Sequence, residues 1–492
     1  MTRVGSEGHA QASDGRSRGC DRLHHSVSQS GFDSRLTVLL SGAFSVAALA
    51  LCLWTVGAYE FGLTVALGAV VAVAVALVVL NAPLAGVCLA VLAAPVDYLA
   101  AGGGGSVSVT PSEAILFITA LSVTPRLLTT VSAQRIPTAL YAFAGLIFVS
   151  IAGLFFAIDT FTVMRIVIDW LAFGLISLFV SQRGASDLTA IAISLALSGG
   201  ILGVMALGNL SEQQAIAGGA IVTNRASASF AHPTSLALFL ILTFPAAFAL
   251  GLRGPTRWRW VMMASGVLAL LGLLLTETRG SIIGAGFALI WMMARWAPFR
   301  RLALAGLGVL VIVVALSFGS VTKSGPVTVV GDRLATLSLN SEGDQRLEIW
   351  ATTPKIIAEH PIFGIGQGNF PAVSPAFGLV DVGGVPFDHA HDLFLNIAAE
   401  LGLVGLALLL IMLFALVGSA RTVLADRQSE FYPLGLAITA SLLGVLVNSL
   451  TEYPLRQNLI LATILIDIGL LLGIERITRA RSAASTVARQ IR

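Results

Sequence analysis

A cluster of titratable side chains occupies residues 388–392, in the order Asp-His-Ala-His-Asp, directly before an apolar run long enough to cross a bilayer. A histidine whose pKa lies near neutrality can take a proton from an incoming hydroxyl group. The alternative is that His389 is a solvated loop residue with no part in chemistry.

A metal site is the second chemistry that Asp388, His389, His391 and Asp392 could form. Carboxylate and imidazole groups both bind metals, but the His-x-His spacing suits a strand, and these residues lead into a predicted helix. We therefore expect no metal at this cluster.

Three arginines are predicted on the same side of the membrane as the cluster: Arg225 in TNRASASFAHP, Arg279 in TETRGS and Arg346 in QRLEIW. A guanidinium group keeps its charge and binds phosphate oxygens through two parallel N–H donors. Several of them on one face could hold a diphosphate. The alternative is that these arginines, and Arg456 with them, anchor their spans at the lipid-water interface.

The composition places these residues in a membrane protein. Of the 492 residues, 56% are hydrophobic and 11% are charged, whereas a soluble globular domain has about 25% charged residues. Apolar runs of about 18 or more residues recur along the chain, and each predicts a transmembrane helix. The three cysteines fall outside any large loop and predict no disulfide framework. The sequence therefore predicts an all-α polytopic membrane protein.

Fourteen spans are predicted, and thirteen remain an alternative because the fourth is short and flanked by proline. The spans are 36–56, 58–80, 82–100, 110–125, 137–157, 162–181, 187–208, 233–251, 257–275, 281–297, 301–318, 392–418, 431–450 and 455–474. With the N-terminus in the cytoplasm, most of the 29 Lys and Arg residues fall on the cytoplasmic side, as the positive-inside rule requires. Both termini are therefore predicted to be cytoplasmic.

The spans define the predicted organisation of the chain. Its parts are a disordered cytoplasmic tail (1–35), transmembrane helices 1–11 (36–318), one large periplasmic loop (319–391), transmembrane helices 12–14 (392–474) and a second cytoplasmic tail (475–492). Within the loop, 344–360 is predicted to lie along the membrane surface as a helix that is broken or restarted at Pro354. The glycine-rich turn that follows, 361–371, would let the backbone approach a ligand closely.

Three segments resemble the signatures of the O-antigen ligase and Wzy-type polymerase superfamily. They are TETRGSIIGAGFALI, QRLEIWATTPKIIAEHPIFGIGQGNF and HAHDLFLNIAAELGLVGLALLL, and the resemblance extends from Thr276 to Phe414. The shared pattern is an outer Arg-Gly that opens a span, an Arg-x3-Trp helix that leads to Pro-x-x-Gly-x-Gly, and a His-Asn pair followed by Ala-Glu-x-Gly. One departure is visible, since Asp392 stands where the family usually has Asn.

The resemblance implies a multi-span, GT-C-like enzyme of the bacterial inner membrane. Such an enzyme takes a glycan from an undecaprenyl diphosphate carrier at the periplasmic face and moves it onto an acceptor sugar in surface polysaccharide biosynthesis. It needs neither a nucleotide sugar nor a cofactor. Arg279 and Arg225 would hold the diphosphate and stabilise its departing charge, with Arg346 as a third candidate. Besides the lipid-linked glycan and the bilayer, the implied partners are a flippase and a chain-length regulator of the same pathway, and no nucleic acid.

The resemblance also assigns the acid-base chemistry. His391 would be the general base on the acceptor hydroxyl, oriented by Asp392 or Asp388, and His389 is the second choice. A polysaccharide polymerase is the favoured reading. An O-antigen ligase that acts on lipid A core is the first alternative, and a protein O-glycosyltransferase is the next. From a different class, a solute transporter would place ionisable residues deep within the spans, whereas the predicted spans are largely free of charge.

Overall fold

The computed structural model describes residues 61–97, 109–130, 136–208, 226–254, 256–318, 342–381 and 383–490. Within these ranges the secondary structure is helical, and the one extended pairing is an isolated antiparallel bridge between Val380 and Pro386. The all-α prediction is therefore confirmed for the described part of the chain. The predicted tail at 1–35, the first predicted span at 36–56 and Arg225 lie outside it.

The chain divides into two compact units, Met1–Ala85 and Gly86–Arg492. Helix α2 (Phe61–Asn81) belongs to the first unit, and α3 (Pro83–Ala93) begins at the boundary. The longer helices of the second unit are α5 (Pro111–Thr130), α6 (Thr138–Gly153), α7 (Thr160–Ser181), α8 (Ala185–Gly208), α9 (Pro233–Arg253), α10 (Arg259–Leu275), α11 (Arg279–Arg295), α12 (Ala297–Phe318), α14 (Glu342–Glu359), α16 (Leu393–Ala425), α17 (Tyr432–Asn448) and α18 (Asn458–Gln490). A single short turn of helix, α15 (Phe370–Val373), precedes α16.

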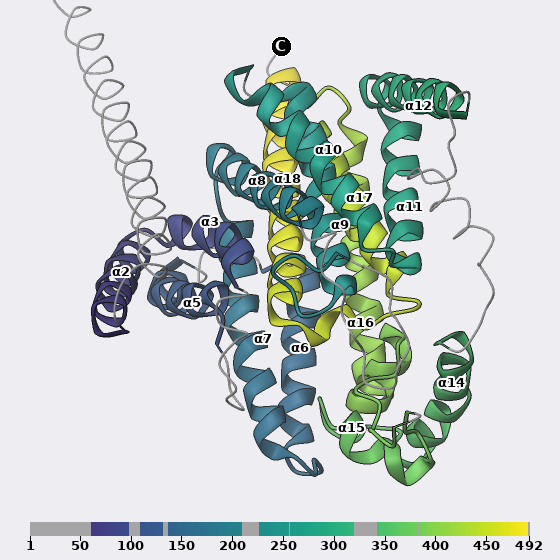
Figure 1. Ribbon diagram of the computed structural model, residues 1–492. Coiled ribbons are helices and arrows are strands. Elements are labelled where there is room, and N and C mark those ends of the chain that lie inside the picture. The colour runs from purple at the N-terminus through teal and green to yellow at the C-terminus, as the bar shows by residue number, and fades with distance from the viewer. Residues whose placement is uncertain are drawn as a thin grey trace, which may run out of the picture. The chain divides into compact units, whose positions relative to one another are not determined.

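Five of the described helices are long and apolar enough to cross a membrane: α7, α8, α9, α16 and α18 as far as Ser485. The protein buries 94% of the apolar window of both α9 and α18, but only 28% of that of α16. In Figure 1, α9 and α18 lie among α7, α8, α10 and α17, while α16 runs along the side of this group. An apolar helix that leaves most of its surface uncovered requires a lipid solvent. The polytopic membrane fold is confirmed, and the number of spans stays a prediction.

Helices α11 and α17 cross at two glycines, and this crossing positions one side of the candidate site. A Cβ atom on Gly284 would lie 2.4 Å from the carbonyl oxygen of Gly444, so no larger residue fits without separating the helices. The two segments also lie close together at the start of α11, where a Cβ on Gly280 would lie 2.4 Å from Thr451 Oγ1. Arg279, the first residue of α11, is therefore set beside the loop that follows α17.

Helix α16 is interrupted at Gly402, where φ is 68° and ψ is −173°. The glycine-rich turn supplies the hydrogen bonds that the interruption removes. The Leu403 N–H donates to the Pro361 carbonyl at 2.8 Å, and the Ile365 N–H donates to the Ala399 carbonyl at 3.0 Å. Irregular backbone inside an apolar run is stable only when its polar groups are paired in this way. The twelfth predicted span is therefore two helices and not the single one that its hydropathy indicated.

The glycine-rich turn approaches protein backbone, whereas the sequence suggested a ligand. Gly364, Gly366 and Gly368 all have positive φ angles, which glycine adopts without strain. A Cβ on Gly364 would lie 2.4 Å from the backbone carbonyl carbon of Glu400. Gly364 therefore lets the turn dock against the interrupted helix α16, while Gly366 and Gly368 let it approach Ala157 and the side chains of α7.

Helix α14 continues through Pro354, and the predicted break there is wrong. Ile349 and Ile356, on either side of the proline, are both fully buried in one apolar cluster with Phe370 and Ala390. Packing on both sides of the proline outweighs the loss of one helical hydrogen bond. Helix α14 is thus held against the start of α16.

Candidate functional site

One carboxylate, that of Glu452, contacts side chains from two other segments of the chain. Its Oε1 atom lies 2.7 Å from Nε2 of His389 and 3.7 Å from Nδ1 of His391. Its Oε2 atom lies 3.8 Å from a guanidinium nitrogen of Arg346, on α14. The histidines immediately precede α16, and Glu452 lies in the loop between α17 and α18. We call these four residues the Glu452 cluster.

Arg456 extends the cluster on the other side of His389. Its guanidinium group contacts the Asp388 carboxylate at 2.5 Å and Nδ1 of His389 at 3.4 Å. An arginine can only donate, so His389 accepts through Nδ1 and donates its Nε2–H to Glu452. The two partners therefore select the neutral imidazole with its proton on Nε2.

The pKa shifts agree with this assignment of protons. Burial lowers the pKa of His389, although its hydrogen bond to Glu452 acts in the opposite direction. Burial alone would raise the pKa of Glu452, but the hydrogen bond from His389 and the nearby charges of His389 and His391 hold it well below its usual range. At neutral pH the cluster thus contains an ionised carboxylate beside neutral His389.

His391 is the histidine that a substrate can reach. Its side chain is 23% exposed, compared with 8% for His389, and no hydrogen-bond partner occupies its buried Nδ1 atom. The Glu452 carboxylate lies beside this imidazole ring. The geometry therefore suits His391 for accepting a proton and His389 for holding Glu452 in place.

Local backbone structure orients the two rings. His391 has a φ angle of 52°, an uncommon conformation for a residue with a side chain. Directly after it, the Asp392 carboxylate caps α16 by accepting from the Leu395 N–H at 2.8 Å, and the Leu393 N–H donates to the Ser449 carbonyl at 2.9 Å. The turn at His391 is therefore held between a capped helix and the end of α17.

The structure brings together some of the predicted site residues and gives others different partners. Arg346, His389 and His391 all meet at Glu452. The carboxylates that were expected to orient His391 have other contacts, since Asp388 pairs with Arg456 and Asp392 caps α16.

Arg279 is exposed at the start of α11, and its neighbour Gly280 contacts Thr451 next to Glu452. The first turn of α11 therefore lies beside the loop that holds Glu452. Arg225 lies outside the described residues, and its predicted role stays a prediction.

Sequence reasoning missed Glu452 and treated Arg456 as an interface anchor. A usable signal was present in TEYPLRQN, where an acid and a base four residues apart occupy a short loop between two apolar spans. Charged residues are costly at such positions unless they have partners. The sequence could not show that Glu452 pairs with His389, because the two residues are 63 positions apart.

The cluster also has the composition of a metal site. Ligand atoms of His389, His391 and Glu452 all lie within 4.8 Å of one another. Arg346 and Arg456, however, already contact the same groups, and a divalent cation would have to bind beside two permanent positive charges. The residues around the triad therefore fit an anion better than a metal.

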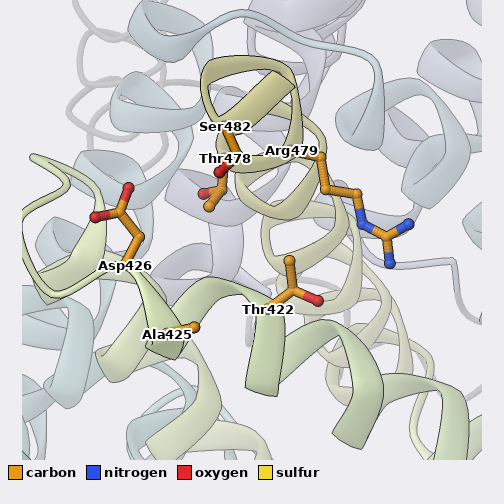
Figure 2. Close-up of a pocket in the computed structure, with 6 residues that line it drawn as sticks. All are labelled: Thr422, Ala425, Asp426, Thr478, Arg479 and Ser482. Carbon is orange, nitrogen blue, oxygen red and sulfur yellow. The ribbon is translucent and has the colours of Figure 1, made fainter. Parts of the chain in front are cut away.

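A pocket elsewhere in the described structure has no connection with this chemistry. Figure 2 shows its lining residues, Thr422, Ala425, Asp426, Thr478, Arg479 and Ser482. They lie at and after the last turns of α16 and along the second half of α18, whereas the Glu452 cluster adjoins the first residues of both helices. This pocket is therefore at the other end of these two helices.

Comparison with known proteins supports the resemblance found in the sequence. Residues 264–410 match the family model described as O-antigen ligase, and this range contains Arg279, Arg346 and both histidines of the cluster. The predicted resemblance is therefore confirmed over that part of the chain, and Glu452 lies beyond it. A chain in a solved structure of a peptidoglycan synthase complex is 18% identical, with a TM-score of 0.41, over 69% of this chain and 97% of that one. No curated protein matches the chain.

Proposed function

We propose that this protein is a metal-independent glycosyltransferase that moves a glycan from undecaprenyl diphosphate onto an acceptor sugar at the periplasmic face of the bacterial inner membrane. The family match supports a glycosyltransferase-like or ligase enzyme of surface polysaccharide biosynthesis. The observation that carries the finer proposal is the Glu452 cluster, which combines a reachable imidazole, an ionised carboxylate and a guanidinium group within the space of one substrate.

The proposed reaction begins with proton transfer from the acceptor hydroxyl to His391. The resulting oxygen nucleophile forms a bond to the anomeric carbon of the donor sugar while the bond from that carbon to the phosphate oxygen breaks. The electron pair leaves with undecaprenyl diphosphate. Glu452 stabilises the imidazolium formed at His391, and its existing hydrogen bond to His389 limits how far it can move.

The arginines supply the electrostatic part of the proposal. Arg346 lies on the cluster and Arg279 in the first turn of α11, so both can approach the diphosphate of a donor whose lipid tail lies in the bilayer. Positive charge fixed before the reaction stabilises a diphosphate leaving group most effectively, because no reorganisation is needed as the bond breaks. Arg225 keeps its predicted place as a further diphosphate ligand.

A polymerase and a ligase differ only in the acceptor, and we propose the polymerase first. The ligase is the second candidate because the matching family model is described as O-antigen ligase. A strain that lacks a polymerase would carry single glycan repeats, whereas a strain that lacks a ligase would accumulate long lipid-linked polymer and leave lipid A core bare. Gel analysis of surface polysaccharide from the deletion strain separates the two.

The experiment that tests the reaction itself uses the purified full chain in bilayer nanodiscs. The donor is lipid-linked glycan extracted from the deletion strain, and the readout is undecaprenyl diphosphate released together with elongated or transferred glycan. We expect turnover that EDTA leaves unchanged. Loss of turnover in EDTA with recovery in added metal would contradict the metal-independent reaction, and uptake of a solute by proteoliposomes without glycan transfer would support the transporter.

A further inference from the structure

Ala390, the residue between the two histidines of the cluster, has both of its backbone polar groups bound by side chains. Its N–H donates to Oδ1 of Asn396 at 2.9 Å, and its carbonyl accepts from the indole Nε1–H of Trp350 at 3.1 Å. The residue is fully buried, so neither group has water as a substitute partner. Two side chains therefore hold the backbone of Ala390 in place.

The two side chains come from elements that are far apart in the sequence. Trp350 lies on α14, in the apolar cluster that holds this helix against the start of α16. Asn396 is fully buried in the first turn of α16, one helical turn beyond the Asp392 cap. The strained φ angle at His391 begins directly after Ala390. A strained backbone conformation such as that of His391 persists only where the surrounding structure holds the backbone in place.

We propose that Trp350 and Asn396 are positioning residues that set the distance and angle between His389, His391 and Glu452. They touch no reacting atom and act through the Ala390 backbone. The two rings have centroids 4.1 Å apart, and their nitrogens lie at unequal distances from one carboxylate oxygen. A small rotation of the Ala390 peptide groups would change both distances at once.

The expected effect on catalysis rests on the proposed function. The expected effect on histidine accessibility is independent of the proposed function. Trp350→Phe keeps an aromatic ring in the apolar cluster but removes the donor. Asn396→Leu keeps the approximate size but removes the acceptor, and Asn396→Asp restores an oxygen at the same place. Trp260→Phe is the matched control, because Trp260 on α10 is 78% exposed.

In nanodiscs, with lipid-linked glycan from the deletion strain as donor, we expect Trp350→Phe and Asn396→Leu each to lower kcat by about 10- to 100-fold. KM for the donor should change by less than about 2-fold, since a positioning loss acts on the transition state and not on ground-state binding. Asn396→Asp should recover most of the loss. The double variant Trp350→Phe/Asn396→Leu should be little worse than either single variant, because both act on one peptide segment.

The structural readout is the rate at which diethylpyrocarbonate modifies His389 and His391, measured by mass spectrometry. We expect both single variants to raise the rate severalfold at His389, which is protected in the wild-type chain, and Trp260→Phe to leave it unchanged. Unchanged modification rates and unchanged kcat in correctly inserted variants would overturn the proposal. A rise in KM with unchanged kcat would also overturn the proposal, because it would show that Trp350 and Asn396 bind substrate. If the wild-type chain transfers no glycan while the modification rates rise as expected, the proposed function fails and the positioning of the histidines stands.

Discussion

Glu452 and His389, 63 residues apart in the chain, share a hydrogen bond of 2.7 Å between a carboxylate and a buried imidazole. The bond ties the loop between α17 and α18 to the start of α16, and His391 approaches the same oxygen.

Glu452→Gln is expected to abolish the electrostatic support of His391 while keeping nearly the same shape. The neutral amide cannot stabilise an imidazolium, so glycan transfer in nanodiscs should fall by at least about 100-fold. Glu359→Gln, at an exposed position on α14, is the matched control and should behave as wild type. Wild-type transfer rates in Glu452→Gln would mean that the carboxylate has no part in the reaction.

Arg279→Ala is expected to lower kcat by about 100-fold, because the arginine would stabilise charge that develops on the departing diphosphate. Arg279→Lys should recover only part of the rate, since an ammonium group lacks the two parallel donors. Arg421→Ala removes an exposed arginine near the other end of α16 and serves as the control. Equal effects of Arg279→Ala and Arg421→Ala on transfer would identify Arg279 as an interface anchor.

The contribution of His389 to stability is expected to fall as the pH drops below 6.5, the ordinary pKa of a histidine. The folded chain lowers the pKa of His389, so between the two pKa values the unfolded state binds more protons and unfolding is favoured. The contribution is fully present above pH 6.5 and is lost as the pH falls toward the lower folded value. One such group gives a slope of up to about 1.4 kcal/mol per pH unit. Glu452, with its low pKa, adds nothing in this window.

Thermal unfolding midpoints of the protein in nanodiscs, measured between about pH 5.5 and 8, test this slope. His389→Gln keeps a polar side chain but cannot titrate. The wild-type midpoint minus the variant midpoint should therefore rise with pH up to about 6.5 and stay level above it. Identical pH dependence in the two proteins would show that His389 is not the responsible group.

Gly402→Ala is expected to prevent correct folding of α16. A Cβ at this position would lie 2.1 Å from the Ile362 carbonyl oxygen, and the positive φ angle adds strain of its own. The combined cost should exceed about 2 kcal/mol. Gly418→Ala, in the same helix with no atom within 4 Å of the added carbon, should be neutral or stabilising. Fluorescence-detected size-exclusion chromatography after heating compares the two, and equal stability would contradict the described interruption.

Much of the fold was predictable because hydropathy is a local property. Spans such as 187–208 and 233–251 correspond to α8 and α9 within a few residues, since an uninterrupted apolar run has few alternatives in a membrane. The interruption in α16 was not predictable in the same way. Gly402 and Gly405 occur in one apolar run, and only the docking of the glycine-rich turn distinguishes the residue with positive φ from its helical neighbour.

The candidate site was predictable only in part, for a similar reason. The sequence identified His389 and His391 as a titratable pair at the start of a span, and it identified Arg346 within a family signature. Their common partner Glu452 belongs to a different loop, and its side chain becomes relevant only after α17 and α18 have placed it. Chemistry that depends on contacts between distant segments does not leave a spacing pattern in one sequence.

The most direct test of the proposed reaction is the initial rate of glycan transfer by His391→Ala in nanodiscs, compared with His360→Ala at the exposed end of α14. The account predicts that His391→Ala inserts normally and loses transfer by about 100- to 10,000-fold, whereas His360→Ala keeps the wild-type rate. Wild-type transfer by His391→Ala would contradict the assignment of the general base.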